Sequence, residues 1–271
     1  MMTTLRRVVL LMFAAFSLTP LLWVLLTAFK ARFDITTARP TVFFAPTLAN
    51  FRALVSDHDL GRLLANSVIV ATTSTLICIA MAAVTAYSLV HEHSSRTRMN
   101  VLVFLLTTRL TPVVALSLPI FVVFTRLGLR GTLIGIATAH TIANLPIAVW
   151  LLSDSFRRVP SEISYAARLD GLSEGALFGR IILPVTRSSI AATALLCFLF
   201  SWNEYALSTL LSTHTTATLS GELPVLITQG VTQWGQLCAG MTVLMVPAIA
   251  VAMIGGRAVL RHQFAGALKK N

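Results

Sequence analysis

Residues 159–188 read VPSEISYAARLDGLSEGALFGRIILPVTRS and form the longest polar and charged run between two strongly apolar segments of the chain. Pro160 precedes a short helical pattern that Asp170 and Gly171 end, and Pro184 follows a second helical pattern. This arrangement predicts two short helices joined by a sharp turn. In a membrane protein such a polar run lies in water on one side of the bilayer, which makes it a candidate docking surface.

The composition is that of an integral membrane protein. Of the 271 residues, 56% are hydrophobic and only 11% are charged, and the mean hydropathy is +0.81. A soluble domain carries about 25% charged residues. We therefore expect an all-α, polytopic membrane protein that forms one transmembrane domain over residues 1–271.

Apolar segments of spanning length recur six times. A hydrocarbon core of about 30 Å takes about 20 apolar residues per helical span. The first segment follows two arginines as in a signal peptide, but it has no small-residue cleavage site, so we interpret it as a retained span. Pro112 is expected to break the third segment near its middle. The six expected spans are residues 8–29, 63–90, 101–124, 133–152, 189–211 and 237–259.

The basic residues indicate how the chain is oriented. The net charge is +11, but no basic stripe is interleaved with aromatic residues, so nucleic acid is not an expected partner. Thirteen Lys and Arg residues flank the spans on the side of the N-terminus and seven on the other side, while Arg109 lies within a span. Because cytoplasmic flanks are enriched in Lys and Arg, we expect both termini and residues 159–188 in the cytoplasm.

Residues 159–188 resemble the coupling segment of importer-type ABC transporter permeases. That segment carries E-A-A, then a Gly, then a distant I-x-L-P, and the matching residues here are Tyr165-Ala166-Ala167, Gly171 and 181–184, IILP. The string AARLDG resembles the carbohydrate-importer branch of the family. Further landmarks that look like those of the smaller maltose permease subunit occur in order along nearly the whole chain, including LPIFVVFTRLGLRGT, LPIAVWLLSDSFRRVP, SWNEY and ELPVLI.

The resemblance implies the type I ABC importer permease fold, with six transmembrane helices and a cytoplasmic coupling helix that lies in a groove of a separate ATPase. It further implies a bacterial or archaeal plasma membrane, with lipid around the chain, and import of a sugar, oligosaccharide or polyol by alternating access. The implied partners are a second homologous permease, two ATPase subunits and an extracytoplasmic solute-binding protein. The chain has no Gly-rich phosphate loop, so ATP and Mg are expected in the ATPase subunits and no cofactor in this chain.

One residue of the coupling motif departs from the family. Tyr165 stands where the family has Glu, and Glu162, three residues earlier on nearly the same helix face, is a candidate substitute. The alternative interpretation of the whole segment is an ordinary amphipathic cytoplasmic loop. The residues expected to take part in ATPase coupling are Glu162, Tyr165, Ala166, Ala167, Asp170, Gly171, Leu183 and Pro184.

Polar and ionisable residues inside the apolar segments are candidates for the substrate path, because charge at membrane depth is costly. Glu204 fits either a structural hydrogen bond between helices or a substrate contact. We expect Arg109 to need a partner or a wet cavity, and Glu204 is a candidate partner. The residues expected to line the substrate path are Arg109, Thr111, Asn144, Trp202, Asn203 and Glu204.

Other classes of function fit the sequence less well. An ion-gradient-driven secondary transporter, the main alternative, would show an internal inverted repeat and several carboxylates in mid-membrane. No catalytic set of residues and no metal-ligand cluster is arranged convincingly, so an enzyme is disfavoured. The three cysteines, Cys78, Cys197 and Cys238, have no ligand-like spacing and are expected to be structural.

Overall fold

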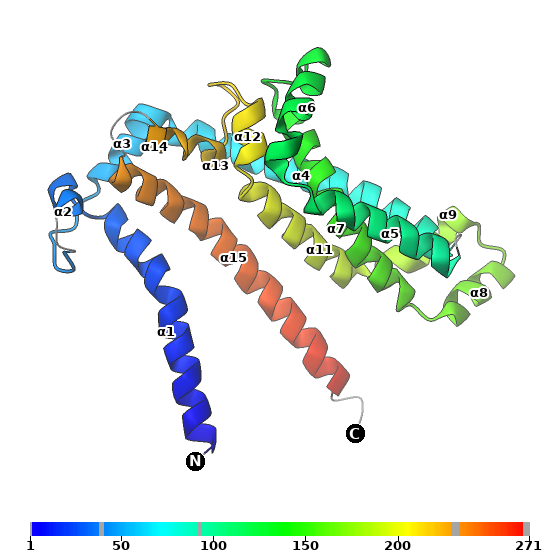
Figure 1. Ribbon diagram of the computed structural model, residues 1–271. Coiled ribbons are helices and arrows are strands. Elements are labelled where there is room, and N and C mark those ends of the chain that lie inside the picture. Colours follow the sequence, from blue (N-terminus) through cyan, green and yellow to red (C-terminus); the bar gives the residue numbers. More distant parts are fainter. Residues whose placement is uncertain (1, 38–40, 92–93, 229–232, 268–271) are drawn as a thin grey trace. The chain divides into compact units, whose positions relative to one another are not determined.

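The computed structural model describes residues 2–37, 41–91, 94–228 and 233–267, and within these ranges every regular element is a helix (Figure 1). In lipid a helix satisfies all its backbone hydrogen-bonding groups internally, which accounts for helices over the apolar segments. The longer helices are α1 (Met2–Ala28), α3 (Ala49–His58), α4 (Leu60–His91), α5 (Ser95–Leu110), α6 (Val113–Arg126), α7 (Leu133–Arg157), α11 (Arg187–Trp202) and α15 (Trp234–Ala267). The shorter ones are α2 (Arg32–Thr36), α8 (Ser161–Leu169), α9 (Glu174–Leu177), the π-helix η1 (Phe178–Ile182), α10 (Leu183–Val185), α12 (Ala206–Leu211), α13 (Leu219–Glu222) and α14 (Val225–Thr228).

The six predicted spans are all helical, but only four are continuous helices. In the described part of the chain, four helices are long and apolar enough to cross a membrane, and two bent helix pairs raise the number to six if each pair is one span. The spans predicted at 8–29, 63–90, 133–152 and 237–259 correspond to the long helices α1, α4, α7 and α15, and are confirmed as continuous helices.

The predicted span 101–124 is broken where Pro112 was expected to break it. Helix α5 ends at Leu110, α6 begins at Val113, and the two axes are bent by 96°. Thr111 is extended, with ψ 125°, because the ring of a following proline disfavours the helical conformation.

The predicted span 189–211 is wrong as a single helix. Helix α11 stops at Trp202, and α12 starts at Ala206 after a three-residue break. Side chains in the break compete for the backbone: Asn203 Nδ2 donates to the Leu199 carbonyl over 2.8 Å, and the Glu204 carboxylate accepts from the amides of Ala206 and Leu207.

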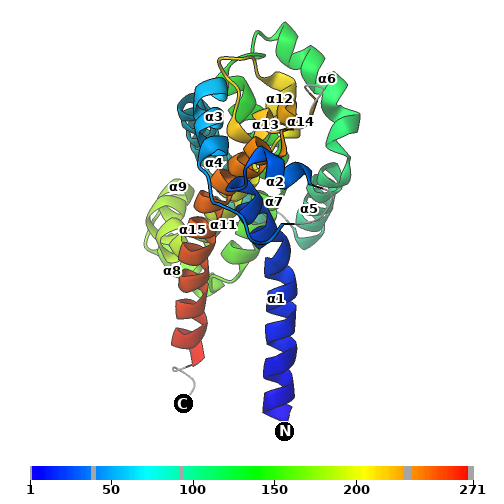
Figure 2. The ribbon, with the colours of Figure 1, turned by 90° about the vertical axis from the view of Figure 1, so that its left-hand side faces the viewer.

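The chain divides into two compact units, residues 1–64 with 222–247 and residues 65–221 with 248–271. The single transmembrane domain expected from the sequence stays a prediction. The larger unit is built on α7, which packs against α5 and α11, and on α4, which contributes small residues such as Ala82 and Ala86 to the same core. Small side chains let membrane helices approach closely. Within this unit α8 and α9 lie together at the end of α7 that is remote from α12 (Figures 1 and 2).

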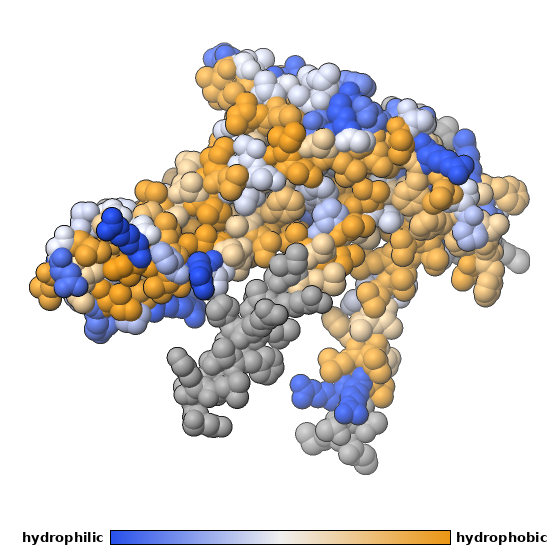
Figure 3. All heavy atoms as spheres, turned by 180° about the vertical axis from the view of Figure 1, so that it is seen from behind, coloured by the Kyte–Doolittle hydropathy of each residue, from blue (hydrophilic) through white to orange (hydrophobic). Residues whose placement is uncertain are grey.

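Large apolar side chains face outward from many of the helices. Leu76 on α4 and Phe104 on α5 are each about two-thirds exposed, as is Phe13 on α1. Apolar residues likewise cover much of the face seen in Figure 3. A surface of this kind meets lipid or partner subunits rather than water.

Candidate functional site

The turn after α8 has the geometry that the sequence predicts. Asp170 caps the helix and Gly171 adopts a left-handed φ of +82°. The Leu172 amide donates to the Ala167 carbonyl and the Gly171 amide to the Arg168 carbonyl, both over 3.0 Å. These two bonds define a Schellman motif, in which glycine supplies the positive φ at little cost. Ala167 and Leu172, which the motif brings together, both pack in the core of α4, α7 and α11.

An ion pair joins the two helices of the loop, and a hydrogen bond fastens them to α4. Arg168 Nε donates to Glu174 Oε1 over 2.7 Å, and Tyr87 Oη, near the end of α4, donates to Glu174 Oε2 over 2.6 Å. Glu174 lies in the polar loop, and the hydrogen bonds from Arg168 and then from Tyr87 lower its pKa from an ordinary 4.5 to about 2. The Tyr87 ring also packs against Phe178, with ring centroids 4.9 Å apart. These contacts hold α8 at a fixed position on the larger unit.

Helix α8 presents an exposed apolar face. Leu169 is 89% exposed and Tyr165 is 62% exposed, and Ala166 and Glu162 also face solvent. Ser164 and Ala167 occupy the opposite, buried face. A helix of a soluble loop would place such large apolar groups inward, so this face is suited to contact another protein.

The eight residues predicted for ATPase coupling therefore do not share one surface. Ala167 is buried in the core, and Leu183 packs against the same core. Pro184 is exposed and stands within α10, just before the 78° bend into α11. The outward-facing residues of the set are Glu162, Tyr165, Ala166, Asp170, Gly171 and Pro184.

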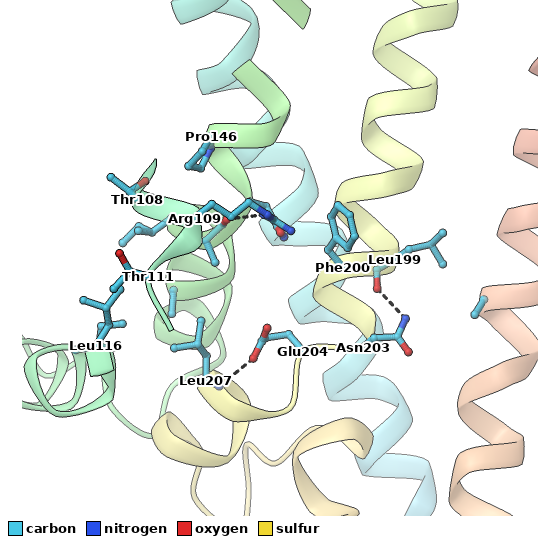
Figure 4. Close-up of a pocket in the computed structure, with 16 residues that line it drawn as sticks. Thr108, Arg109, Thr111, Leu116, Pro146, Leu199, Phe200, Asn203, Glu204 and Leu207 are labelled. Atoms are coloured by element: carbon cyan, nitrogen blue, oxygen red, sulfur yellow. Dashed lines mark hydrogen bonds between the residues drawn. The ribbon is translucent and has the colours of Figure 1, made fainter. Parts of the chain in front are cut away.

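A cavity of about 660 Å³ lies among the helices of the larger unit. Five of the six residues predicted for the substrate path line it, coming from α5, α7 and the breaks after α5 and α11 (Figure 4). These five are Arg109, Thr111, Asn144, Asn203 and Glu204. The other walls are largely apolar, with Ile120, Phe200 and Leu207 among them.

Trp202 does not line this cavity, although the sequence predicted it on the path. Its side chain is 2% exposed, and its ring stacks on that of Phe198 with centroids 5.9 Å apart. Trp202 is the last residue of α11, so its ring fills the interior of the unit while the polar residues that follow it leave the helix.

The proposed pairing of Arg109 with Glu204 is wrong, because the structure gives the two charges different partners. Arg109 Nη1 donates to the Ala143 carbonyl over 2.8 Å, and its guanidinium lies 4.8 Å from the centre of the Phe200 ring. Glu204 Oε1 instead accepts from two backbone amides at the start of α12. Both charged groups thus reach the same cavity without neutralising each other (Figure 4).

A buried histidine that sequence reasoning missed holds the break after α11. His140 on α7 is 1% exposed; its Nδ1 lies 2.7 Å from Ser201 Oγ and its Nε2 lies 3.1 Å from Ser208 Oγ. Ser208 Oγ donates its own proton to the Glu204 carbonyl, so it accepts from Nε2–H and Nδ1 accepts from Ser201. This network joins α7, α11 and α12, and it fixes the backbone of Glu204. The available sequence signal was His140 beside Thr141 and Asn144 within an apolar run.

This chain is similar to known transport proteins along nearly its whole length. A family model described as "Binding-protein-dependent transport system inner membrane component" matches residues 79–263. The probable ABC transporter permease protein y4oR of Sinorhizobium fredii is 30% identical over 250 residues, which cover 92% of this chain and 90% of that protein. The trehalose transport system permease protein SugB of Mycobacterium tuberculosis is 26% identical over 258 residues, covering 94% and 93%.

The fold has also been seen in a solved structure. A chain of a bacterial ABC transporter involved in the import of the acidic polysaccharide alginate superposes with a TM-score of 0.74 at 18% identity, covering 94% of this chain and 95% of that one. This likeness confirms the type I importer permease fold. Together with the family match, it sets aside the ion-gradient-driven secondary transporter. The chain therefore belongs to the family of binding-protein-dependent transport system inner membrane components and is a membrane-embedded permease subunit of an ATP-driven ABC importer.

Proposed function

We propose that this permease imports a sugar, an oligosaccharide or a polyol, delivered by an extracytoplasmic solute-binding protein, across a bacterial or archaeal plasma membrane. It pairs with a second homologous permease and with two ATPase subunits, which bind ATP and Mg and carry out the hydrolysis. Both termini and residues 159–188 face the cytoplasm. The carbohydrate class is supported by relatives such as the trehalose permease and the sulfoquinovosyl glycerol permease SmoH of Agrobacterium fabrum, 30% identical over 257 residues, 92% of this chain and 88% of that protein.

The exposed face of α8 is the observation that carries the coupling role. Leu169 and Tyr165 offer apolar surface to a partner, while the Arg168–Glu174 ion pair and the turn at Gly171 hold the helix rigidly. When two ATPase subunits close on ATP, a helix held in this way transmits the movement to α4, α7 and α11 instead of flexing. Glu162, which faces solvent near Tyr165, takes the place of the family's carboxylate in this proposal.

The cavity beside Arg109 and Glu204 forms part of the substrate path in this proposal. Its amides and hydroxyls, from Asn144, Asn203 and Thr111, suit the hydroxyl groups of a sugar. Alternating access exposes this cavity first to the binding protein and then to the cytoplasm.

The test is ATPase activity of the assembled complex. The chain is co-purified with its second permease and ATPase subunits, reconstituted in lipid, and assayed with the candidate binding protein across a panel of sugars and polyols. We expect stimulation by the binding protein loaded with one member of the panel. If the complex assembles and no loaded binding protein stimulates hydrolysis, the carbohydrate assignment fails.

Matched variants separate the two sites. Leu169→Ser should reduce co-purification of the ATPase, whereas Leu127→Ser, which alters a similarly exposed leucine just after α6, should not. Arg109→Gln should change the sugar concentration needed for half-maximal stimulation, whereas Arg126→Gln, at an exposed position away from the cavity, should leave it unchanged. Equal behaviour within either pair contradicts the role given to that site.

A further inference from the structure

A second cavity, of about 520 Å³, lies in the smaller unit at the point where the apolar run of α1 ends. Its wall combines residues of α1 and α15 with residues of the polar segment after α1, including Lys30 and Asp34. None of these residues belongs to the coupling loop or to the cavity beside Arg109. The proposed function makes no use of this cavity.

Lys30 is an unpaired cation on the wall of this cavity. Its side chain is 2% exposed, and among the described residues its ammonium group has no carboxylate partner and no hydrogen-bond acceptor. This group lies over two aromatic rings: Nζ is 4.2 Å from the centre of the Trp23 ring and 5.4 Å from that of Phe44. Aromatic faces attract a cation but do not replace its lost hydration. An anion bound beside this ammonium group would compensate for its lost hydration.

The chain around Lys30 is held firmly in place. Asn50 Nδ2 donates to the carbonyls of Ala28 and Lys30 over 2.9 and 2.8 Å, and the Thr47 amide donates to the Phe29 carbonyl over 2.8 Å. The carbonyl groups of residues 28–30 are thus satisfied, and the backbone that carries Lys30 is ordered. Such prior ordering lowers the entropic cost of binding.

Thr27 and Asp34 are among the other polar residues that line the same cavity. Thr27 Oγ1 is buried and has no hydrogen-bond partner in the part of the chain that the structure describes, so it is available to a ligand oxygen. Asp34 also lines the cavity, and it forms no ion pair with Lys30. The Lys30 ammonium and the Asp34 carboxylate do not pair with each other, so together they suit a ligand that carries both a negative and a positive charge.

The surroundings of the cavity are those of a membrane interface. Trp23 and Trp234 both line it, and Trp is enriched where hydrocarbon meets headgroups. Nearby in the chain, Phe43 is 97% exposed, and Phe33 and Val42 are also largely exposed. In the most apolar 18-residue window of α1 no residue is buried within this chain. Acyl chains would cover these apolar groups, which a soluble ligand would leave in water.

We propose that this cavity binds the phosphate group of a zwitterionic phospholipid headgroup of the phosphoethanolamine type. Lys30 and the Thr27 hydroxyl bind the phosphate oxygens, and Asp34 binds the ammonium group of the same headgroup. The exposed Phe33 and Phe43 contact the acyl chains. A free phosphate ion shares the first part of this chemistry, but it lacks both the ammonium group and the chains.

Native mass spectrometry of the delipidated full chain in detergent tests the proposal. The probes are dihexanoyl phosphatidylethanolamine, dihexanoyl phosphatidylglycerol and inorganic phosphate. We expect the first lipid to bind at one equivalent and more tightly than the second, and inorganic phosphate to bind more weakly than either. Lys30→Gln should weaken binding of both lipids about tenfold or more, as expected for loss of a charge-assisted hydrogen bond, and Lys30→Arg should restore most of it.

Matched controls distinguish this site from general lipid adhesion. Arg32→Gln removes an exposed cation two residues along and should not change lipid binding. Thr27→Val removes the hydroxyl on the cavity wall and should weaken lipid binding, whereas Thr19→Val, at an exposed position of α1 outside the cavity, should not. Asp34→Asn should remove the preference for phosphatidylethanolamine while leaving binding of phosphatidylglycerol intact.

Melting temperatures with and without lipid distinguish loss of lipid binding from loss of stability in a variant. Phosphatidylethanolamine should raise the melting temperature of the native chain but not that of Lys30→Gln. Without lipid, Lys30→Gln should melt no lower than the native chain, because it removes a buried cation that has no anionic partner. The proposal is overturned if lipid binds equally to the native chain and Lys30→Gln, or if neither lipid binds. It is also overturned if inorganic phosphate alone reproduces the full effect.

Discussion

Substitution of Gly171 tests the turn on which the coupling loop depends. An alanine Cβ at this position would meet no atom within 4 Å, so the cost comes from the backbone alone. A left-handed conformation costs a non-glycine residue about 1–2 kcal/mol, and the stiffer unfolded chain offsets about 0.4–1 kcal/mol of that. We expect Gly171→Ala to destabilise the chain by about 1 kcal/mol, and Gly171→Asn to cost less, because Asn tolerates this region better.

A thiol-reactive fluorescent dye provides the assay, since the three cysteines are free and buried and become reactive only on unfolding. The matched control is Gly175→Ala, where an added Cβ also meets open space but φ is not positive. This control should be neutral or slightly stabilising, because alanine favours a helix over glycine. If both alanine variants melt at the same temperature, the left-handed turn after α8 is not present and the rigid coupling helix is refuted. In the assembled complex Gly171→Ala should also lower transport relative to ATP hydrolysis.

Three more predictions concern other parts of the larger unit. The lowered pKa of Glu174 means that its stabilising contribution is complete above about pH 4.5 and is lost as the pH falls through about 2. Glu174→Gln should therefore make the melting temperature less dependent on pH in the acid range. The difference should be well under 1 kcal/mol, because the ion pair is half exposed. His140→Leu leaves the Ser201 hydroxyl without its partner and should cost about 1–3 kcal/mol, part of which Ser201→Ala in the same chain should restore. Gly135→Ala places a methyl group against the backbone carbonyl of the preceding turn and should cost about 3 kcal/mol by thermal melting, whereas Gly179→Ala meets open space and should not.

Local signals in the sequence located the turns well. Gly171 after Asp170 predicted the sharp stop of α8, and Pro112 predicted the break in the third apolar segment. In both cases the covalent structure of the residue itself restricts or permits a backbone conformation. Such effects act within a few residues, so a single stretch of sequence carries them.

The break after Trp202 was not predicted, because isolated polar residues such as Asn203 and Glu204 also occur within continuous spans and do not by themselves indicate where a helix stops. What stops α11 is a set of side-chain hydrogen bonds from Asn203 and Glu204, supported from α7 by His140. Contacts between segments 60 or more residues apart leave no periodic pattern. The same reason explains why Trp202 was placed on the substrate path: the sequence showed its position along the helix but not the direction of its ring.

Lys30 gives the clearest case of a residue whose role the sequence concealed. Counted with the other basic residues at the ends of spans, it indicated only topology. The structure instead buries it beneath Trp23 and Phe44. Burial depends on how the segment after α1 folds back on the end of that helix through Asn50, and nothing in the local composition predicts such a fold.

The π-helix η1 sets the rotation of α9 relative to α10 about their common helix axis. Each residue of an α-helix advances the side chains by about 100°, and a π turn accommodates one residue more than an α turn. Deleting one residue from 178–182 would therefore rotate α9 by roughly a quarter turn relative to α10, with every hydrophobic residue of both helices unchanged. The direction in which α9 presents Glu174 to Arg168 of α8 is thus set by a count of five residues, FGRII, and insertions or deletions there would be far more damaging than substitutions.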